Sequence, residues 1–103
     1  METNTRPLYF PRPHLPEAQL EGPPAFLVGT RDAMILDAND AASALGLLPG
    51  TAAPPALGGV LKAFDEARRA GACLTRLRPP GTLMARTFRC TQAGAHTVLV
   101  RAI

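Results

Sequence analysis

Residues 32–41 read Asp-Ala-Met-Ile-Leu-Asp-Ala-Asn-Asp-Ala, a stretch that changes from a strand pattern to a helix pattern. The apolar run Ala33–Ala38 favours a β-strand, and the polar Thr30–Asp32 is suited to a hairpin turn after the run Ala25–Gly29. Asn39 stands where the second apolar run ends, and its side-chain oxygen can cap a helix. The stretch therefore predicts a β-hairpin that leads directly into a short helix.

The remaining sequence predicts a second helix and three more strands. Gly46 is placed to end the short helix, and a proline-rich loop then leads to an amphipathic helix over residues 57–70. Three strands follow, over residues 72–78, 83–92 and 96–103. The turns between them are centred on Pro80–Gly81 and on Gly94. The chain is therefore expected to belong to the α+β class.

Residues 1–24 differ in composition from the rest of the chain. They hold six of the 11 prolines and are expected to form an extended arm, with at most one helical turn near residues 17–21. Residues 25–103 would form the single domain that 103 residues allow. No apolar run approaches the roughly 20 residues of a membrane-spanning helix. Two cysteines are too few for a disulfide framework, so a cytoplasmic location without membrane contact is expected.

The three C-terminal strands have two different faces, because side chains alternate along a strand and opposed residues share a face. The face toward the helices is mostly apolar, and a small apolar ligand could lie against it. Arg86 on this face either reaches solvent at the rim or meets an anionic ligand. The candidate pocket residues are Ile35, Leu61, Phe64, Thr75, Met84, Arg86 and Phe88.

The opposite face mixes arginines with large aliphatic side chains, and contiguous exposed apolar area usually marks a contact surface. The candidate interface residues are Leu74, Arg76, Leu83, Arg89, Leu99, Arg101 and Ile103. Three occupants are compatible with this face: the proline-rich arm, a second copy of the chain, or a helix of a longer parent protein. A protein contact is expected, although arginine stems can also shield such a patch by themselves.

Catalytic motifs are absent from the sequence. It contains no phosphate-binding glycine loop, no Cys-x-x-Cys, no His-Glu-x-x-His and no Gly-x-Ser-x-Gly, so an enzyme is not expected. His14 and His96 lie in different predicted segments, which argues against a metal site.

Two alternative functions stay open. Arginines on the mixed face could contact a nucleic-acid backbone, but the net charge of +3 is small and no aromatic residues interleave with the cations. The four arginines concerned are Arg76, Arg78, Arg89 and Arg101. Cys73 and Cys90 fall on one sheet face in neighbouring strands, so they could form a thiol redox switch or simply be two small buried hydrophobes.

The order of the predicted elements resembles the PAS family of sensor domains over residues 25–103. Asp32 looks like the family's turn aspartate, and Asn39 with the following Ala41 looks like the start of its first helix. Gly46 matches the glycine that commonly ends that helix. The resemblance implies a five-stranded antiparallel sheet of order 2-1-5-4-3 with the helices packed on one face.

The resemblance also implies a function in signal transduction. Such a domain senses a signal and dimerises or docks to the rest of a signalling protein, for example a bacterial sensor histidine kinase of a two-component system. Haem is not expected, because the long helix contains no histidine. Flavin is not expected either, because neither Cys73 nor Cys90 stands in the Asn-Cys-Arg-Phe type motif of the flavin photosensors.

Overall fold

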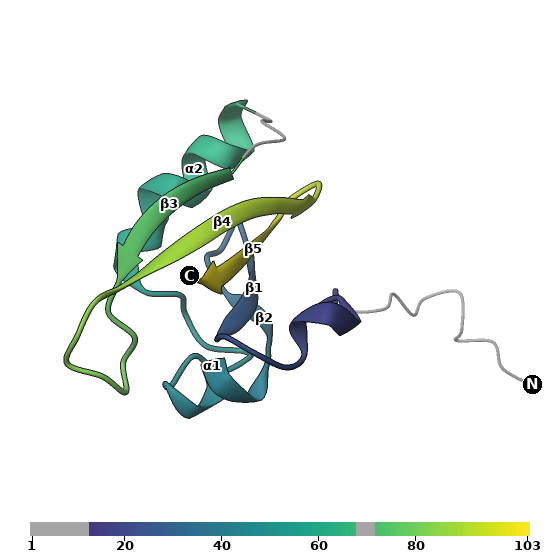
Figure 1. Cartoon of the computed structure of the whole chain (residues 1–103). Helices are drawn as coiled ribbons and strands as arrows, with labels where there is room; N and C mark the ends of the chain where they lie inside the picture. Colours follow the sequence, from purple (N-terminus) through teal and green to yellow (C-terminus); the bar gives the residue numbers. More distant parts are fainter. Residues whose placement is uncertain (1–12, 68–71) are drawn as a thin grey trace, which may run out of the picture.

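The computed structural model describes residues 13–67 and 72–103, and it describes residues 65–67 by their backbone alone. Its strands are β1 (Ala25–Gly29), β2 (Ile35–Ala38), β3 (Ala72–Leu77), β4 (Arg86–Gly94) and β5 (Thr97–Ala102). Its helical elements are the α-helices α1 (Asp40–Ala44) and α2 (Gly58–Ala67) and the 3₁₀ turns η2 (Glu17–Gln19) and η3 (Pro55–Leu57). The five strands form one antiparallel sheet of order β2-β1-β5-β4-β3 (Figure 1), which confirms the predicted strand order and the α+β class.

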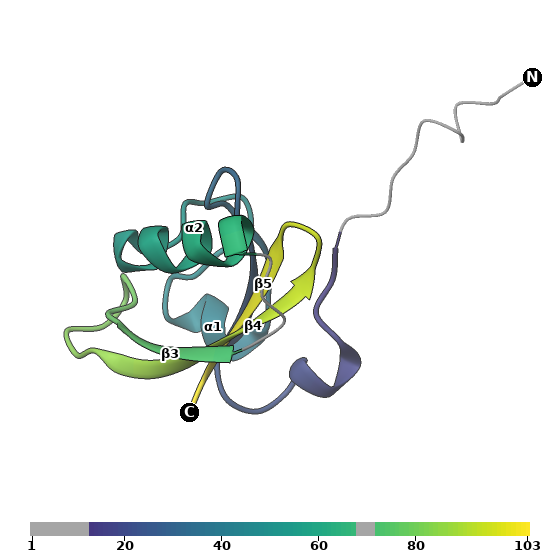
Figure 2. The ribbon, with the colours of Figure 1, turned by 90° about the horizontal axis from the view of Figure 1, so that it is seen from above.

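The core lies on the face of the sheet that α1 and α2 cover (Figure 2). Leu61 and Phe64 of α2 and Ala42 of α1 are buried in one cluster with the inward side chains of the strands. Phe26 and Phe88 meet edge to face in this cluster, with ring centroids 6.3 Å apart. Each large apolar side chain buried there stabilises the fold by about 1.5–3 kcal/mol, so the burial of Leu61 and Phe64 stabilises the packing of α2 on the sheet.

The short helix α1 begins and ends at the predicted residues. Asn39 is its N-cap. Gly46 has a φ of 86°, a backbone conformation that glycine adopts without strain. The Gly46 N–H donates to the carbonyl of Ser43, and the Leu47 N–H donates to the carbonyl of Ala42. These two bonds make a Schellman motif, which satisfies carbonyls at the helix end.

The connection between β3 and β4 is longer than the tight turn predicted at Pro80–Gly81. Leu77 opposes Arg86 rather than Met84, so the register differs from the prediction by two residues. The Gly81 N–H donates to the carbonyl of Leu45 over 2.8 Å, which ties the connection to the end of α1. A Cβ atom at Gly81 would lie 2.9 Å from that carbonyl oxygen. Because the shift is an even number of residues, the side chains that remain in β3 and β4 keep their predicted faces, whereas residues 83–85 leave the strand.

The two edges of the sheet differ in how their backbone groups are paired. At the β2 edge, the Ile35 N–H donates to the Thr51 carbonyl and the Gly50 N–H donates to the Ile35 carbonyl, each over 2.8 Å. β2 begins at Ile35 rather than at the predicted Ala33, because Ala33 adopts a left-handed φ of 56°. At the β3 edge, no backbone hydrogen bond within the described ranges joins the strand to any element except β4. One edge is therefore covered by the chain itself, and the other has no backbone partner among the described residues.

The predicted arm is only partly described, from residue 13 onward. The predicted helical turn near residues 17–21 is present as η2. Residues 1–12 of the arm, and residues 68–70 at the end of the predicted long helix, lie outside the described residues. Among the helices that the structure describes, none has the length and apolar character needed to cross a membrane.

Candidate functional site

The face of the sheet opposite the helices, which we call the outer face, has a covered half over β2, β1 and β5. Leu15 of the arm is only 5% exposed and packs with Ala25 and Leu27. The half-buried Leu36 and Leu99 pack against the same cluster. This small second core shows that the arm is the occupant of part of the face for which a protein contact was predicted.

Asn39 joins the arm to the sheet and to α1. Its Oδ1 accepts hydrogen bonds from the N–H groups of Ala25 and Ala42, over 3.1 and 2.9 Å. Its Nδ2 donates to the carbonyls of Gln19 and Pro23, each over 2.9 Å. An amide side chain offers two acceptor and two donor positions, and all are used here. The buried Asn39 therefore does more than the capping that its sequence position predicted.

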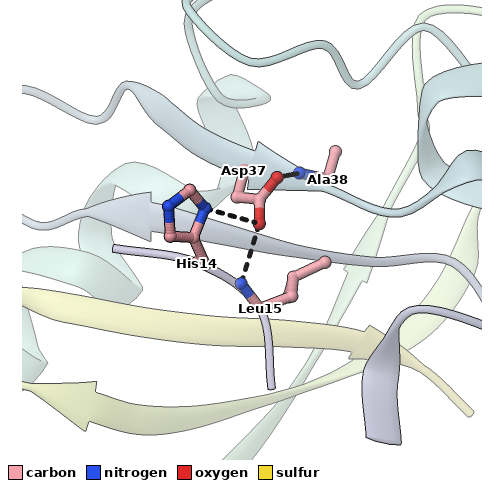
Figure 3. Close-up of polar contacts among 4 residues, drawn as sticks. All are labelled: His14, Leu15, Asp37 and Ala38. Carbon is pink, nitrogen blue, oxygen red and sulfur yellow. Dashed lines mark hydrogen bonds and ion pairs between the residues drawn. The ribbon is translucent and has the colours of Figure 1, made fainter. Parts of the chain in front are cut away.

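Asp37 holds the arm at a second point (Figure 3). Its Oδ2 accepts from the N–H of Leu15 over 2.8 Å, and its Oδ1 accepts from the N–H of Ala38 over 2.9 Å. His14 Nδ1 lies 3.8 Å from the same Oδ2, and its side chain is mostly exposed. Asp37 opposes Leu27 on β1, so it lies on the outer face beside the cluster that Leu15 covers. The Asp37 carboxylate therefore holds Leu15, the arm residue that packs against the sheet.

The other half of the outer face, over β3, β4 and the end of β5, carries exposed side chains. Leu74 opposes Arg89, and Arg89 opposes Arg101, so the three form one row across three strands. Arg76 follows Leu74 on the same face of β3, and Ile103 lies next to Thr87 at the end of β5. We call the set Leu74, Arg76, Arg89, Arg101 and Ile103 the open patch.

The open patch is both apolar and positively charged. Leu74 is 61% exposed and Ile103 is 66% exposed. Within residues 13–67 and 72–103, no carboxylate forms an ion pair with Arg76 or Arg89. Arg101 donates to the side-chain oxygen of Gln19 over a long 3.5 Å. The patch can therefore accept a partner that supplies negative charge and apolar contact together.

Two of the predicted interface residues do not belong to the open patch. Leu99 is half-buried in the cluster with Leu15, because it opposes Leu27 in the covered half. Leu83 is 91% exposed, but it lies in the connection before β4 rather than on the sheet. The prediction placed it on the sheet because it assumed a tight turn at Pro80–Gly81. The other five predicted interface residues form the patch.

The predicted pocket residues separate into two groups. Ile35, Leu61, Phe64 and Phe88 meet in the core cluster. Met84 does not join them: it is 74% exposed, because the connection anchored at Gly81 keeps it out of the strand. Arg86 at the start of β4 is exposed, in agreement with the rim alternative, and Thr75 on the edge strand is half-buried.

Metal-binding groups are absent from the part of the chain that the structure describes: no three His, Cys, Asp or Glu side chains lie together. His14 contacts Asp37, and His96 Nε2 lies 2.9 Å from Arg31 Nη2. The two histidines are therefore in separate places, as their sequence positions predicted.

Cys73 and Cys90 are directly opposed on β3 and β4. Cys73 is exposed and Cys90 is buried. Burial, together with the charge of the neighbouring Cys73 and a side-chain hydrogen bond with it, raises the pKa of the Cys90 thiol to about 12. The prediction that they share a face in neighbouring strands is confirmed, whereas burial of both is wrong because β3 is an edge strand.

The sequence named the arm as one of three occupants of this face, but it did not identify Leu15 and Asp37 as the contacts that hold the arm there. Strict alternation would place Asp37 on the same face as the buried Ile35. The irregular register between Leu27 and Val28 instead places Asp37 opposite Leu27 on the outer face, and no signal in the sequence marks that irregularity. Comparison with known proteins identifies no family for this chain: no protein-family model, no curated protein and no solved structure matches it.

Proposed function

We propose that residues 25–103 form a PAS-like regulatory module that docks an acidic segment of another protein on the open patch. The sheet order and the helix that begins after Asn39 and ends at Gly46 support the PAS-like part of this proposal. Signal sensing and membership of a signalling protein such as a histidine kinase rest on the sequence resemblance. The proposal assigns no catalytic activity to the domain, and it places the protein in the cytoplasm.

The docking role is supported mainly by the positive charge and the solvent exposure of the open patch. Arg89 stands between Leu74 and Arg101 in one row, so a partner strand or helix laid across β3–β5 would meet cations and an aliphatic side chain together. Burying Leu74 and Ile103 would stabilise such a contact by area removed from water. An acidic partner would also pair with Arg76 and Arg89, with which no carboxylate of the described residues forms an ion pair.

A protein partner is favoured over nucleic acid by the side chains around the arginines. Single-stranded nucleic acids are held by aromatic side chains that stack on bases as well as by cations. The phenylalanines in the described part of the chain, Phe26, Phe64 and Phe88, are all buried in the core. Aliphatic side chains at Leu74 and Ile103 suit a protein surface better than a phosphate backbone.

A partner of opposite charge is favoured over a second copy. In a twofold symmetric dimer the same patch meets itself. The cationic row of Arg89 and Arg101 would then lie against an identical cationic row, and like charges placed together at an interface are unfavourable. An acidic segment avoids this repulsion and uses the same apolar contact.

The test uses a fluorescently labelled peptide of alternating glutamate and leucine, titrated with the full chain at low ionic strength. Binding is expected, and Arg89→Glu should weaken it about tenfold because a like charge then faces the probe. Lys62→Glu is the matched control, since it makes the same charge change at an exposed site on α2, across the sheet from the patch. It should leave the affinity within about twofold.

Three results would count against the proposal. Equal weakening by Arg89→Glu and Lys62→Glu would mean that only net charge matters. Tighter binding of an oligothymidine strand than of the peptide would favour the nucleic-acid alternative. A dimer in sedimentation that Leu74→Asp converts to a monomer would replace the acidic partner with a second copy.

A further inference from the structure

Cys73 and Cys90 occupy positions from which a disulfide can form without movement of the backbone. They are Cα partners in the antiparallel pair of β3 and β4, so their side chains leave the same face of the sheet. Directly opposed residues in such a pair have Cα atoms about 4.5 or 5.5 Å apart, depending on the hydrogen-bonding position. Disulfides form across Cα separations of about 4.4–6.8 Å. Both spacings fall inside that range.

The two thiols differ in their access to solvent, and the pKa of Cys90 is raised. Cys73 is exposed on the edge strand, whereas Cys90 is buried and opposes Val100 on its other side. The thiolate is the form that attacks a disulfide. Since burial raises the pKa of Cys90 to about 12, that thiol stays protonated at neutral pH. An oxidant from solution therefore reaches Cys73 first, and Cys90 is protected from direct attack.

We propose that Cys73 and Cys90 form a reversible intrachain disulfide when the chain meets a low-molecular-weight disulfide. The Cys73 thiolate attacks one sulfur of the external disulfide, the external sulfur–sulfur bond breaks, and the leaving thiolate takes a proton from water. Cys90 then loses its proton to solvent and attacks the Cys73 sulfur of the mixed disulfide, which expels the second external thiolate. In total, two cysteine thiols are oxidised and one external disulfide is reduced to two thiols.

The bond would act on the strand that carries part of the open patch. β3 is an edge strand and is paired only with β4 among the described elements. Leu74 and Arg89 are the immediate chain neighbours of the two cysteines and oppose each other on the outer face. Oxidation therefore fixes the edge strand directly beneath one row of the patch. This redox site does not depend on the proposed docking function, and its test needs no partner.

The experiment treats the full chain with oxidised glutathione at pH 8 and follows the intact mass. The wild-type chain should lose the mass of two hydrogens and retain no glutathione. Cys90→Ala should retain one glutathione on Cys73, because the second step is then impossible. Cys73→Ala should stay unmodified, because Cys90 is buried and protonated. Reduction with dithiothreitol should restore the starting mass of the wild-type chain.

Thermal unfolding of the oxidised and reduced wild-type chains provides a second measurement that does not rely on the variants. A closed loop between residues 73 and 90 should raise the Tm by about 10 °C. A stable glutathione adduct on the wild-type chain, a covalent dimer through Cys73, or an adduct on Cys90 in the Cys73→Ala chain would each overturn the proposal. An oxidised chain with an unchanged or lower Tm would show that the bond strains the sheet, and this too would contradict it.

Discussion

The outer face of the sheet has two halves that carry aliphatic side chains and differ in what covers them. In the covered half, Leu27 and Leu99 lie under Leu15 of the arm, and Asn39 and Asp37 hold that arm by side-chain hydrogen bonds. The open patch has comparable apolar side chains, but arginines stand between them, and among the described residues the arm reaches it only through the long hydrogen bond from Arg101 to Gln19. An apolar surface that serves only stability is covered by the chain itself. An apolar surface that stays exposed beside arginines is available to a partner of opposite charge.

The edges of the sheet repeat this difference. The loop over Gly50–Thr51 pairs with Ile35 and so closes the β2 edge, whereas in residues 13–67 and 72–103 no backbone group pairs with the outer side of β3. Exposed edges are usually protected in natural proteins, because a second chain can add to them. Both the covered face and the covered edge are therefore at one end of the sheet, and both open features are at the other.

The largest expected effect is at the anchor of the covered half. Asn39→Ala removes every hydrogen bond that this side chain makes and leaves the buried Ala25 N–H unpaired. We expect a loss of about 3–5 kcal/mol in the free energy of unfolding, measured with urea. Asn39→Asp keeps both acceptor contacts and loses both donors, so it should fall between the wild type and Asn39→Ala. Equal stability of Asn39→Asp and wild type would show that the arm contacts contribute nothing.

Truncation of the arm's apolar contact should have the next largest effect. Leu15→Ala should cost about 2 kcal/mol, at the lower end of the range for buried leucines because the cluster is small. Leu20→Ala is the matched control, since Leu20 belongs to the same segment and is half-exposed. Urea unfolding should show at most about 0.5 kcal/mol for it. Similar values for the two variants would mean that the arm does not pack as described.

Asp37→Asn should have a smaller effect on the same half. The amide keeps one oxygen, so it can accept from either Leu15 or Ala38 but it loses the charge-assisted contacts that Asp37 makes with both N–H groups. We expect a loss of about 1 kcal/mol at pH 7. In Asp37→Asn, the exchange rate of the Leu15 amide hydrogen should increase relative to the wild type, and it should increase more than that of the Ala25 amide hydrogen. Unchanged exchange at Leu15 would contradict this role of Asp37.

The smallest effect on stability is expected in the open half. Leu74→Ala and Leu99→Ala make the same change on the same face, one in each half. Leu74→Ala should alter the free energy of unfolding by less than about 0.5 kcal/mol, whereas Leu99→Ala should cost about 1–2 kcal/mol. If urea unfolding gives equal costs, the distinction between the halves is wrong.

The parts of the fold that depend on neighbours in the chain could be predicted from the sequence. The cap at Asn39 and the end at Gly46 follow from local chemistry, and the buried stripe of Leu61 and Phe64 follows from helical periodicity. The strand order came from the resemblance in element order, which is a property of the whole domain.

The parts that failed depend on contacts between distant residues. The register of β3 and β4 goes with a long connection whose Gly81 N–H bonds to the Leu45 carbonyl, a contact between distant residues that no turn signal encodes. Leu99 could not be separated from Leu74 by periodicity, because both face outward and only Leu15 of the arm distinguishes them. Likewise, the donors of Asn39 reach carbonyls at Gln19 and Pro23, and a carbonyl carries no sequence signature.

The most direct test of the division into two halves is a map of where an acidic partner binds. The labelled chain would be titrated with the peptide of alternating glutamate and leucine while its backbone amide NMR signals are followed. We expect shifts at Leu74, Arg76, Arg89 and Arg101, and none at Leu15, Leu27 or Leu36 in the covered half. Shifts centred on the covered half, or displacement of Leu15 by the peptide, would contradict the account.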